Sequence, residues 1–145
     1  ADFDARPFAT WADIDAYLEA TAGVLMRVSV ALCEAPRDVP DAFIKAAGRA
    51  WGYTGLLRAA EYWRLRGRSV LPTSGGDFNE MRQRASTAYE VARALGPALP
   101  QEAFPAFGYL ALVRGYLKAV EQRRPERPLF LRQLSLVAAS ATGRI

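Results

Sequence analysis

A chain of 145 residues, of which 51% are hydrophobic and 23% charged, has the composition of one globular domain, which excludes a disordered or repetitive chain. The 19 Lys and Arg residues against 15 Asp and Glu residues give a mildly basic net charge of +4, which singles out no class of partner. The absence of histidine and the single cysteine, Cys33, exclude Ser-His-Asp and Cys-His triads, His-containing zinc sites and an internal disulfide.

Helix signals recur along the chain, whereas strand and hairpin signals are almost absent. The first helix is predicted over 11–34, opened by a capping box in which Thr10 precedes Asp13 by three residues. Steps of four and three residues define its expected buried stripe: Ile14, Leu18, Thr21, Leu25, Val28 and Leu32. A helix with so much apolar surface is expected inside a bundle.

A second helix is predicted over 40–66, ended by Gly67, with a narrow face of mostly small side chains. Its periodic residues are Phe43, Ala46, Ala47, Ala50, Trp51, Thr54 and Leu57. Residues 67–77 are rich in turn formers and are predicted to be a loop. The third predicted helix, 78–95, has the clearest amphipathic pattern and stops at Gly96.

The fourth helix is predicted to start at Pro100 or Phe104 and to run to Arg124, and the fifth covers 129–142. About five helices with short connections indicate an all-α bundle formed by residues 1–145 as one domain. The most apolar run, 20–33, is too short to span a membrane and contains an arginine. Because the single cysteine gives no sign of an oxidising compartment, a cytoplasmic location is expected.

Three glycines lie inside the second predicted helix at positions 48, 52 and 55. Each costs about 1 kcal/mol relative to alanine at an exposed helix position, so some other effect favours them. Either they let a neighbouring helix approach closely, or they border a cavity. Periodicity alone leaves both interpretations open.

Two segments carry a family resemblance. The run Ala47-Gly48-Arg49-Ala50-Trp51-Gly52-Tyr53-Thr54-Gly55-Leu56-Leu57-Arg58, followed by Gly67-Arg68-Ser69-Val70-Leu71-Pro72, resembles the second signature of the squalene/phytoene synthase family. Tyr17-Leu18-Glu19-Ala20-Thr21-Ala22-Gly23 is similar to the family's Tyr-x-x-Tyr-Val-Ala-Gly segment. The resemblance implies that the chain is the C-terminal part of a longer isoprenoid-synthase-like helical fold.

The resemblance also implies a site from which the metal ligands are missing. Active members carry two aspartates, four residues apart, that bind magnesium and through it the substrate diphosphate; here these positions are Ala59 and Trp63. The family's first Asp-x-x-x-Asp motif is not found in the sequence either. No metal site or cofactor is therefore expected, although the family uses magnesium.

Other family positions are retained or replaced by small residues. Carried over residue by residue, the resemblance implies this substrate-binding set: Tyr17, Gly23, Gly52, Gly55, Arg58 and Arg68. Five arginines between positions 49 and 68 can bind an isoprenyl diphosphate or an acidic lipid headgroup. The alternative is a solvated helix face with ordinary salt bridges. On the first alternative, Arg58 is expected on a cavity wall without a carboxylate partner.

Two further charge groups are weaker candidates. Asp15 and Glu19 share a helix face at a spacing that can ligate a metal, but acids early in a helix are explained by its macrodipole. Arg123, Arg124 and Arg127 form a basic hinge between prolines. Without interleaved aromatic residues or a known motif, the hinge predicts no nucleic-acid partner.

Two functions of different classes remain. One is a transferase that joins two isoprenyl diphosphates, provided that an upstream half supplies the metal site. The favoured one is a non-catalytic binding or scaffold protein, of the degenerate branch that includes assembly factors for respiratory complex I. For it, the expected partners are an isoprenyl diphosphate, an anionic lipid at the periphery of the inner membrane, another protein or a second copy of the chain.

Overall fold

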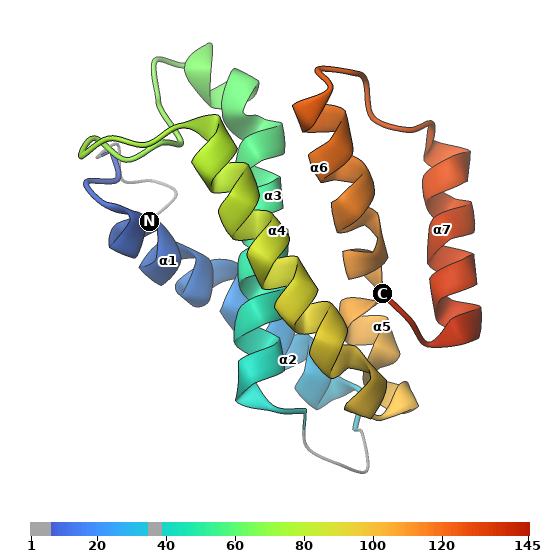
Figure 1. Cartoon of the computed structure of the whole chain (residues 1–145). Helices are drawn as coiled ribbons and strands as arrows, with labels where there is room; N and C mark the ends of the chain where they lie inside the picture. The colour runs from blue at the N-terminus through green and yellow to red at the C-terminus, as the bar shows by residue number, and fades with distance from the viewer. Residues whose placement is uncertain (1–6, 35–38) are drawn as a thin grey trace.

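The computed structural model describes residues 7–34 and 39–145, and within these ranges it contains helices and no strands. The all-α class predicted from the sequence is therefore confirmed. In chain order the α-helices are α1 (Trp11–Leu18), α2 (Val24–Leu32), α3 (Asp41–Arg64), α4 (Phe78–Leu95), α5 (Phe104–Phe107), α6 (Val113–Glu121) and α7 (Leu129–Thr142). Figure 1 shows α3 running through the middle of the bundle, α4 beside it, and α7 outside α6.

The first predicted helix begins as expected but is not a continuous α-helix. The Thr10 side chain accepts a hydrogen bond from the Asp13 backbone, and the Asp13 side chain accepts one from the Thr10 backbone, so the capping box is confirmed. A π-helical turn, η1 (Glu19–Gly23), then separates α1 from α2. The extra residue in this turn rotates everything that follows around the helix axis.

This rotation makes the second half of the predicted stripe wrong. Ile14 and Leu18 are buried in α1, but in α2 Met26 faces the core. The three apolar residues expected inside, Leu25, Val28 and Leu32, are exposed. Cys33, expected to be buried at the end of this helix, is half-buried and free.

Helix α3 confirms the second predicted helix and crosses the first one closely. A Cβ added at Gly48 would lie 2.9 Å from the Gly23 Cα atom, a distance that real Cβ atoms do not tolerate. One added at Gly52 would lie 2.6 Å from the Leu18 side chain. Close helix packing therefore accounts for Gly48 and Gly52, as the first of the two interpretations has it.

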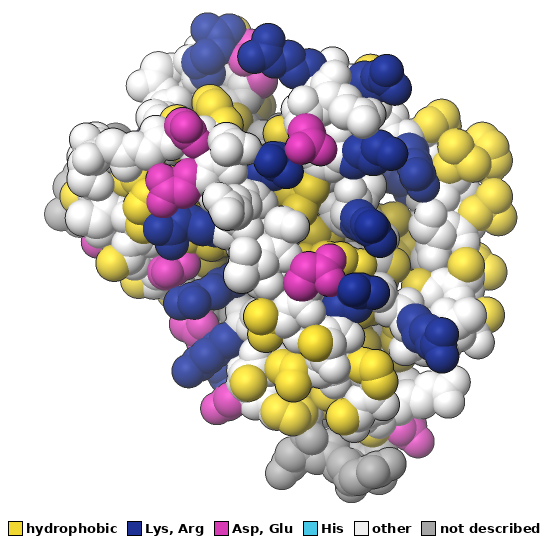
Figure 2. Space-filling model, viewed as in Figure 1, with side chains coloured by type: hydrophobic (Ala, Val, Ile, Leu, Met, Phe, Trp, Pro, Cys, Tyr) yellow, Lys and Arg dark blue, Asp and Glu magenta, His cyan; other side chains and the backbone are white. Residues whose placement is uncertain are grey.

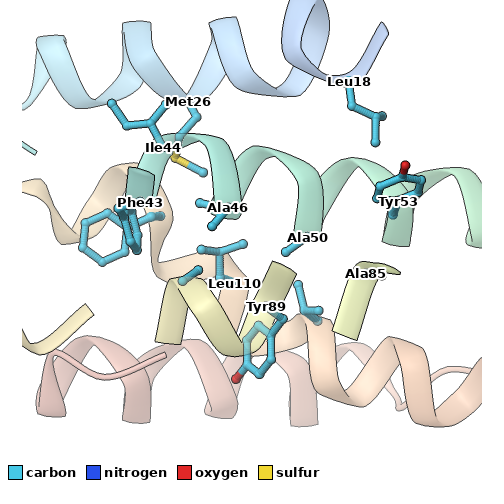
Figure 3. Packing of buried hydrophobic residues seen from close by; sticks show 14 of the residues in the cluster. Leu18, Met26, Phe43, Ile44, Ala46, Ala50, Tyr53, Ala85, Tyr89 and Leu110 are labelled. Atoms are coloured by element: carbon cyan, nitrogen blue, oxygen red, sulfur yellow. The ribbon is translucent and has the colours of Figure 1, made fainter. Parts of the chain in front are cut away.

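The core is built around α3. Figure 3 shows Leu18 and Met26 pointing toward α3 from one side, with Tyr89 of α4 among the buried residues. Phe43 of α3 packs edge-on against Phe107, with ring centroids 4.8 Å apart. The predicted bounds of α4 are confirmed, and the Asp77 side chain caps it by accepting a hydrogen bond from the Glu80 backbone.

The fourth predicted helix is wrong as a single element. After η2 (Gly96–Ala98), which precedes it, the segment contains the short helices η3 (Gln101–Ala103), α5 and η4 (Gly108–Leu112) before α6 begins. Gly108 is pressed against the Phe104 ring, where an added Cβ would lie 2.5 Å from a ring carbon, so the backbone turns tightly there. The fifth predicted helix is confirmed as α7, which ends at Gly143 in a left-handed conformation.

Within the described residues, no helix has the length and apolar character needed to cross a bilayer.

Candidate functional site

The far half of α3 carries the positions at which the resemblance places two magnesium ligands. Ala59 and Trp63 are both half-buried there. The Trp63 ring packs against the core, meets the Tyr62 ring edge-on at 5.7 Å, and has the Arg68 guanidinium 5.3 Å from its centroid. An indole therefore fills the space beside α3 that a carboxylate and a metal ion would need.

The nearest acid on α3 does not restore a metal site. Glu61 accepts two hydrogen bonds from Arg64, at 2.8 and 2.7 Å, and these hold the pKa of Glu61 below its ordinary value. In the part of the chain that the structure describes, no three His, Cys, Asp or Glu residues gather as metal ligands. The side chains at these positions do not fit a magnesium ion, which requires oxygen donors.

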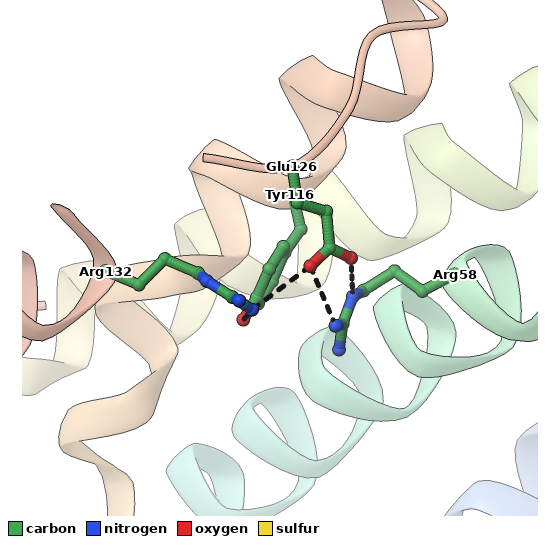
Figure 4. Close-up of polar contacts among 4 residues, drawn as sticks. All are labelled: Arg58, Tyr116, Glu126 and Arg132. Atoms are coloured by element: carbon green, nitrogen blue, oxygen red, sulfur yellow. Dashed lines mark hydrogen bonds and ion pairs between the residues drawn. The ribbon is translucent and has the colours of Figure 1, made fainter. Parts of the chain in front are cut away.

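Arg58 lies one turn before Glu61, and its side chain reaches toward α6 and the segment before α7. Its guanidinium lies 4.0 Å from the centroid of the Tyr116 ring and donates hydrogen bonds to both carboxylate oxygens of Glu126. Arg132 of α7 donates to the same carboxylate at 3.1 Å and to the Tyr116 hydroxyl at 3.2 Å. Figure 4 shows these four residues converging from α3, α6, α7 and the segment between α6 and α7.

These contacts overturn the expectation that Arg58 lacks a carboxylate partner. Its hydrogen bonds to Glu126 raise the pKa of Arg58, and each side chain of the pair is about a third exposed. Glu126 lies between two guanidiniums, so its charge is already compensated and a divalent cation would be repelled there. Glu126 thus occupies the edge of Arg58 that an anionic ligand would use.

The structure does not gather the remaining predicted site residues around Arg58. Tyr17 lies on α1, with its ring 5.3 Å from that of Phe8. Gly23 and Gly52 lie in the contact between the first helices and α3, whereas a Cβ added at Gly55 would meet no atom within 4 Å. Gly55 is therefore the one glycine of α3 that helix packing does not explain.

Asp15 and Glu19 do not form a metal site together. Asp15 accepts a hydrogen bond of 2.7 Å from the Tyr53 hydroxyl and lies 3.5 Å from Arg49. Burial, followed by this bond to Asp15, raises the pKa of Tyr53. Glu19 pairs instead with Arg27 at 3.4 Å. Ion pairing, rather than the helix macrodipole alone, accounts for both acids.

Sequence reasoning missed the three residues around Arg58: Tyr116, Glu126 and Arg132. Glu126 follows Arg58 by 68 residues, and no spacing rule connects positions so far apart. The one available signal was the basic hinge, in which Glu126 precedes Arg127 as a lone acid between prolines. Glu126 could be identified as the counter-charge of Arg58 only once the fold was known.

Comparisons with known proteins agree with the motifs on α1 and α3. A sequence model of squalene/phytoene synthase matches residues 1–75, which include both of the segments that carry the resemblance. No curated protein matches the chain. No solved structure matches it either. On the match over residues 1–75, the chain belongs to the squalene/phytoene synthase family.

Proposed function

We propose that this chain is a non-catalytic member of the squalene/phytoene synthase family that holds an isoprenyl diphosphate or an anionic lipid without magnesium, in a binding or scaffold role. The observation that carries the proposal is the far half of α3. The arginines that match the family signature are retained there, whereas Ala59 and Trp63 offer no oxygen ligand to a metal ion.

The surroundings of Trp63 support the loss of metal chemistry. Its ring packs against the core between Tyr62 and Arg68, so the space is filled by protein. The two nearby acids are held by arginines, Glu61 by Arg64 and Glu126 by Arg58. Moving either acid toward a metal would leave a guanidinium without its partner, which costs free energy.

Cations near this site can hold an anion on their own. Arg68 is half-buried over the Trp63 ring and makes no ion pair in the described part of the chain. Arg58 becomes available to a diphosphate when Glu126 turns away, because Glu126 retains Arg132 as a partner. Arginine forks bind phosphate oxygens without a metal, and salt weakens such binding by screening.

A turnover assay tests the absence of catalysis. The chain is incubated with farnesyl or geranylgeranyl diphosphate and magnesium, and the release of pyrophosphate and the hydrocarbon product are measured. We expect neither above the protein-free level. Magnesium-dependent formation of a head-to-head product would establish the competing function, an active transferase of the family.

Variants at Arg58 and Glu126 test the binding. Glu126→Gln removes the internal competitor of the anion, so we expect tighter binding of farnesyl diphosphate in EDTA, by about threefold to tenfold. Arg58→Ala is expected to weaken it by about tenfold, whereas Arg123→Ala, an equal loss of charge on the exposed hinge, changes it little. Equal effects of the two arginine variants would indicate diffuse surface charge.

A further inference from the structure

A basic groove lies between α6 and α7, outside the residues matched by the family. It encloses about 340 Å³ and is lined by the cations Arg114, Lys118, Arg127 and Arg132, with Tyr116 and Ser135. None of its lining side chains is acidic. Figure 2 shows Lys and Arg side chains gathered over α6, beside hydrophobic side chains along the outer side of α7.

The positive charge of this groove is mostly uncompensated. Arg114, Lys118 and Arg127 make no ion pair with any residue that the structure describes, and Arg132 shares one carboxylate, Glu126, with Arg58. Arg114 and Lys118 also stand four residues apart on α6, where like charges repel each other. Intramolecular salt bridges therefore do not explain this cluster of cations.

Two further features indicate a ligand. The Nε atom of Arg132 is buried and has no hydrogen-bond partner within the described chain, which leaves a charged donor unsatisfied. Gly115 stands inside α6 and lines the groove, although a Cβ there would meet nothing within 4 Å. A glycine that weakens its helix and packs against nothing keeps the groove open.

We infer that the groove between α6 and α7 binds a phosphate monoester group. Such a dianion has three terminal oxygens, which can accept hydrogen bonds from the arginine forks and the lysine at the same time. When the Arg132 side chain turns toward the groove, a phosphate oxygen supplies the acceptor that its buried Nε atom lacks. The inference goes beyond the proposed function. The groove shares Tyr116 and Arg132 with the cluster around Arg58, but Arg114, Lys118 and Gly115 lie outside that cluster and distinguish the two.

The test uses two probes that carry the same phosphate group. Glycerol 3-phosphate, measured by equilibrium dialysis, presents the group in solution. Phosphatidate in phosphatidylcholine vesicles, measured by co-sedimentation, presents it at a lipid surface, with pure phosphatidylcholine vesicles as the background. Binding of the soluble probe identifies a free phosphate ester as the ligand, and binding to vesicles alone identifies a lipid headgroup.

Three variants locate the binding. The double variant Arg114→Gln/Lys118→Gln is expected to lose about tenfold or more in affinity. The control Arg84→Gln/Arg93→Gln removes the same charge from arginines that pair within α4, away from the groove and from the α3 motif, and should stay within about twofold. Gly115→Leu fills the groove and is expected to abolish binding while the helix remains at least as stable.

The results either support the groove or overturn it. Loss of binding in the double variant and in Gly115→Leu, with the control unaffected, supports it for whichever probe binds. The inference is overturned if the native chain binds neither probe at low salt. It is also overturned if the control variant loses as much affinity as the double variant, or if Gly115→Leu binds as tightly as the native chain. A folded far-ultraviolet circular dichroism spectrum is required of each variant.

Discussion

At the scale of single residues, the glycines of α3 show that one residue type serves different ends within one helix. Gly48 lies against the backbone at Gly23, so any side chain there would separate two helices. Gly55 has no atom nearby that a Cβ would touch. The sequence presents them alike, and only the position of the crossing helix distinguishes them.

Alanine at these two positions is therefore expected to act in opposite directions. Gly48→Ala should lower the free energy of unfolding by about 1–3 kcal/mol, because the Cβ meets backbone that cannot move aside cheaply. Gly55→Ala should raise it by about 0.5–1 kcal/mol through helix propensity. Urea unfolding followed at 222 nm measures both, and a stabilised Gly48→Ala would contradict the close crossing.

At the scale of elements, capping residues and helix-breaking residues predicted where helices begin and end better than periodicity predicted which residues inside them are buried. The capping box at Thr10 marked the start of α1 correctly, and Gly96 marked the end of α4. The π-turn at 19–23 was not predictable, because it exchanges regular hydrogen bonding for the fit of Gly23 against α3. Periodicity assumes an unbroken helix, so the stripe residues that follow the turn on α2, Leu25, Val28 and Leu32, were assigned to the wrong face.

The capping box of α1 makes the stability of the protein depend on pH in the acid range. Hydrogen bonds from Thr10 hold the pKa of Asp13 below its ordinary value of 3.8. Because the pKa of Asp13 is lower in the folded chain than in the unfolded chain, the ionised carboxylate stabilises the folded state above pH 3.8. This stabilisation is lost as the pH falls through the folded-state pKa. We therefore expect Asp13→Asn to be less stable than the native chain at pH 7, with the gap closing toward about pH 2.

Urea unfolding at the two pH values measures this gap. Glu102→Gln is the matched control, because Glu102 is exposed and makes no ion pair in the described part of the chain. The control should differ little from the native chain at either pH. A gap between Asp13→Asn and the native chain that persists unchanged in acid would show that the carboxylate does not stabilise the cap.

At the scale of the whole molecule, two helices leave apolar side chains in solvent. On α2 the exposed residues are Val24, Leu25, Val28 and Leu32, and on α7 they are Leu129, Phe130, Leu131, Leu134 and Val137. Leu32 is 78% exposed and Leu25 68%. Contiguous apolar surface of this kind is typical of contacts with other chains.

We expect the chain to self-associate through the exposed face of α2. Light scattering should show a mass that rises with concentration, because association removes these side chains from water. Leu25→Asn/Val28→Asn should shift the chain toward monomer. The control Ser29→Asn lies on the half-buried side of α2, outside the exposed face, and should leave the measured mass unchanged. A native chain that stays monomeric at all concentrations would contradict the expectation.

The candidate site was predictable only where it depends on local sequence. The positions Arg58, Ala59 and Trp63 were identified from the resemblance to the family signature, and the structure places them on one helix. The partner of Arg58 was not recognised, because Glu126 reaches it through the packing of α6 and α7 against the rest of the bundle. Long-range ion pairs depend on how helices pack, which a single sequence does not encode in its spacing.

In the proposed function, arginines alone hold the diphosphate, so its binding to this chain should be independent of magnesium. The most direct test is a calorimetric titration with farnesyl diphosphate, once in magnesium and once in EDTA, on the native chain and on Ala59→Asp/Trp63→Asp. We predict equal affinity in the two buffers for the native chain, and a magnesium-dependent gain once the two carboxylates are introduced. Binding of farnesyl diphosphate to the native chain that tightens by about tenfold or more in magnesium would contradict this independence.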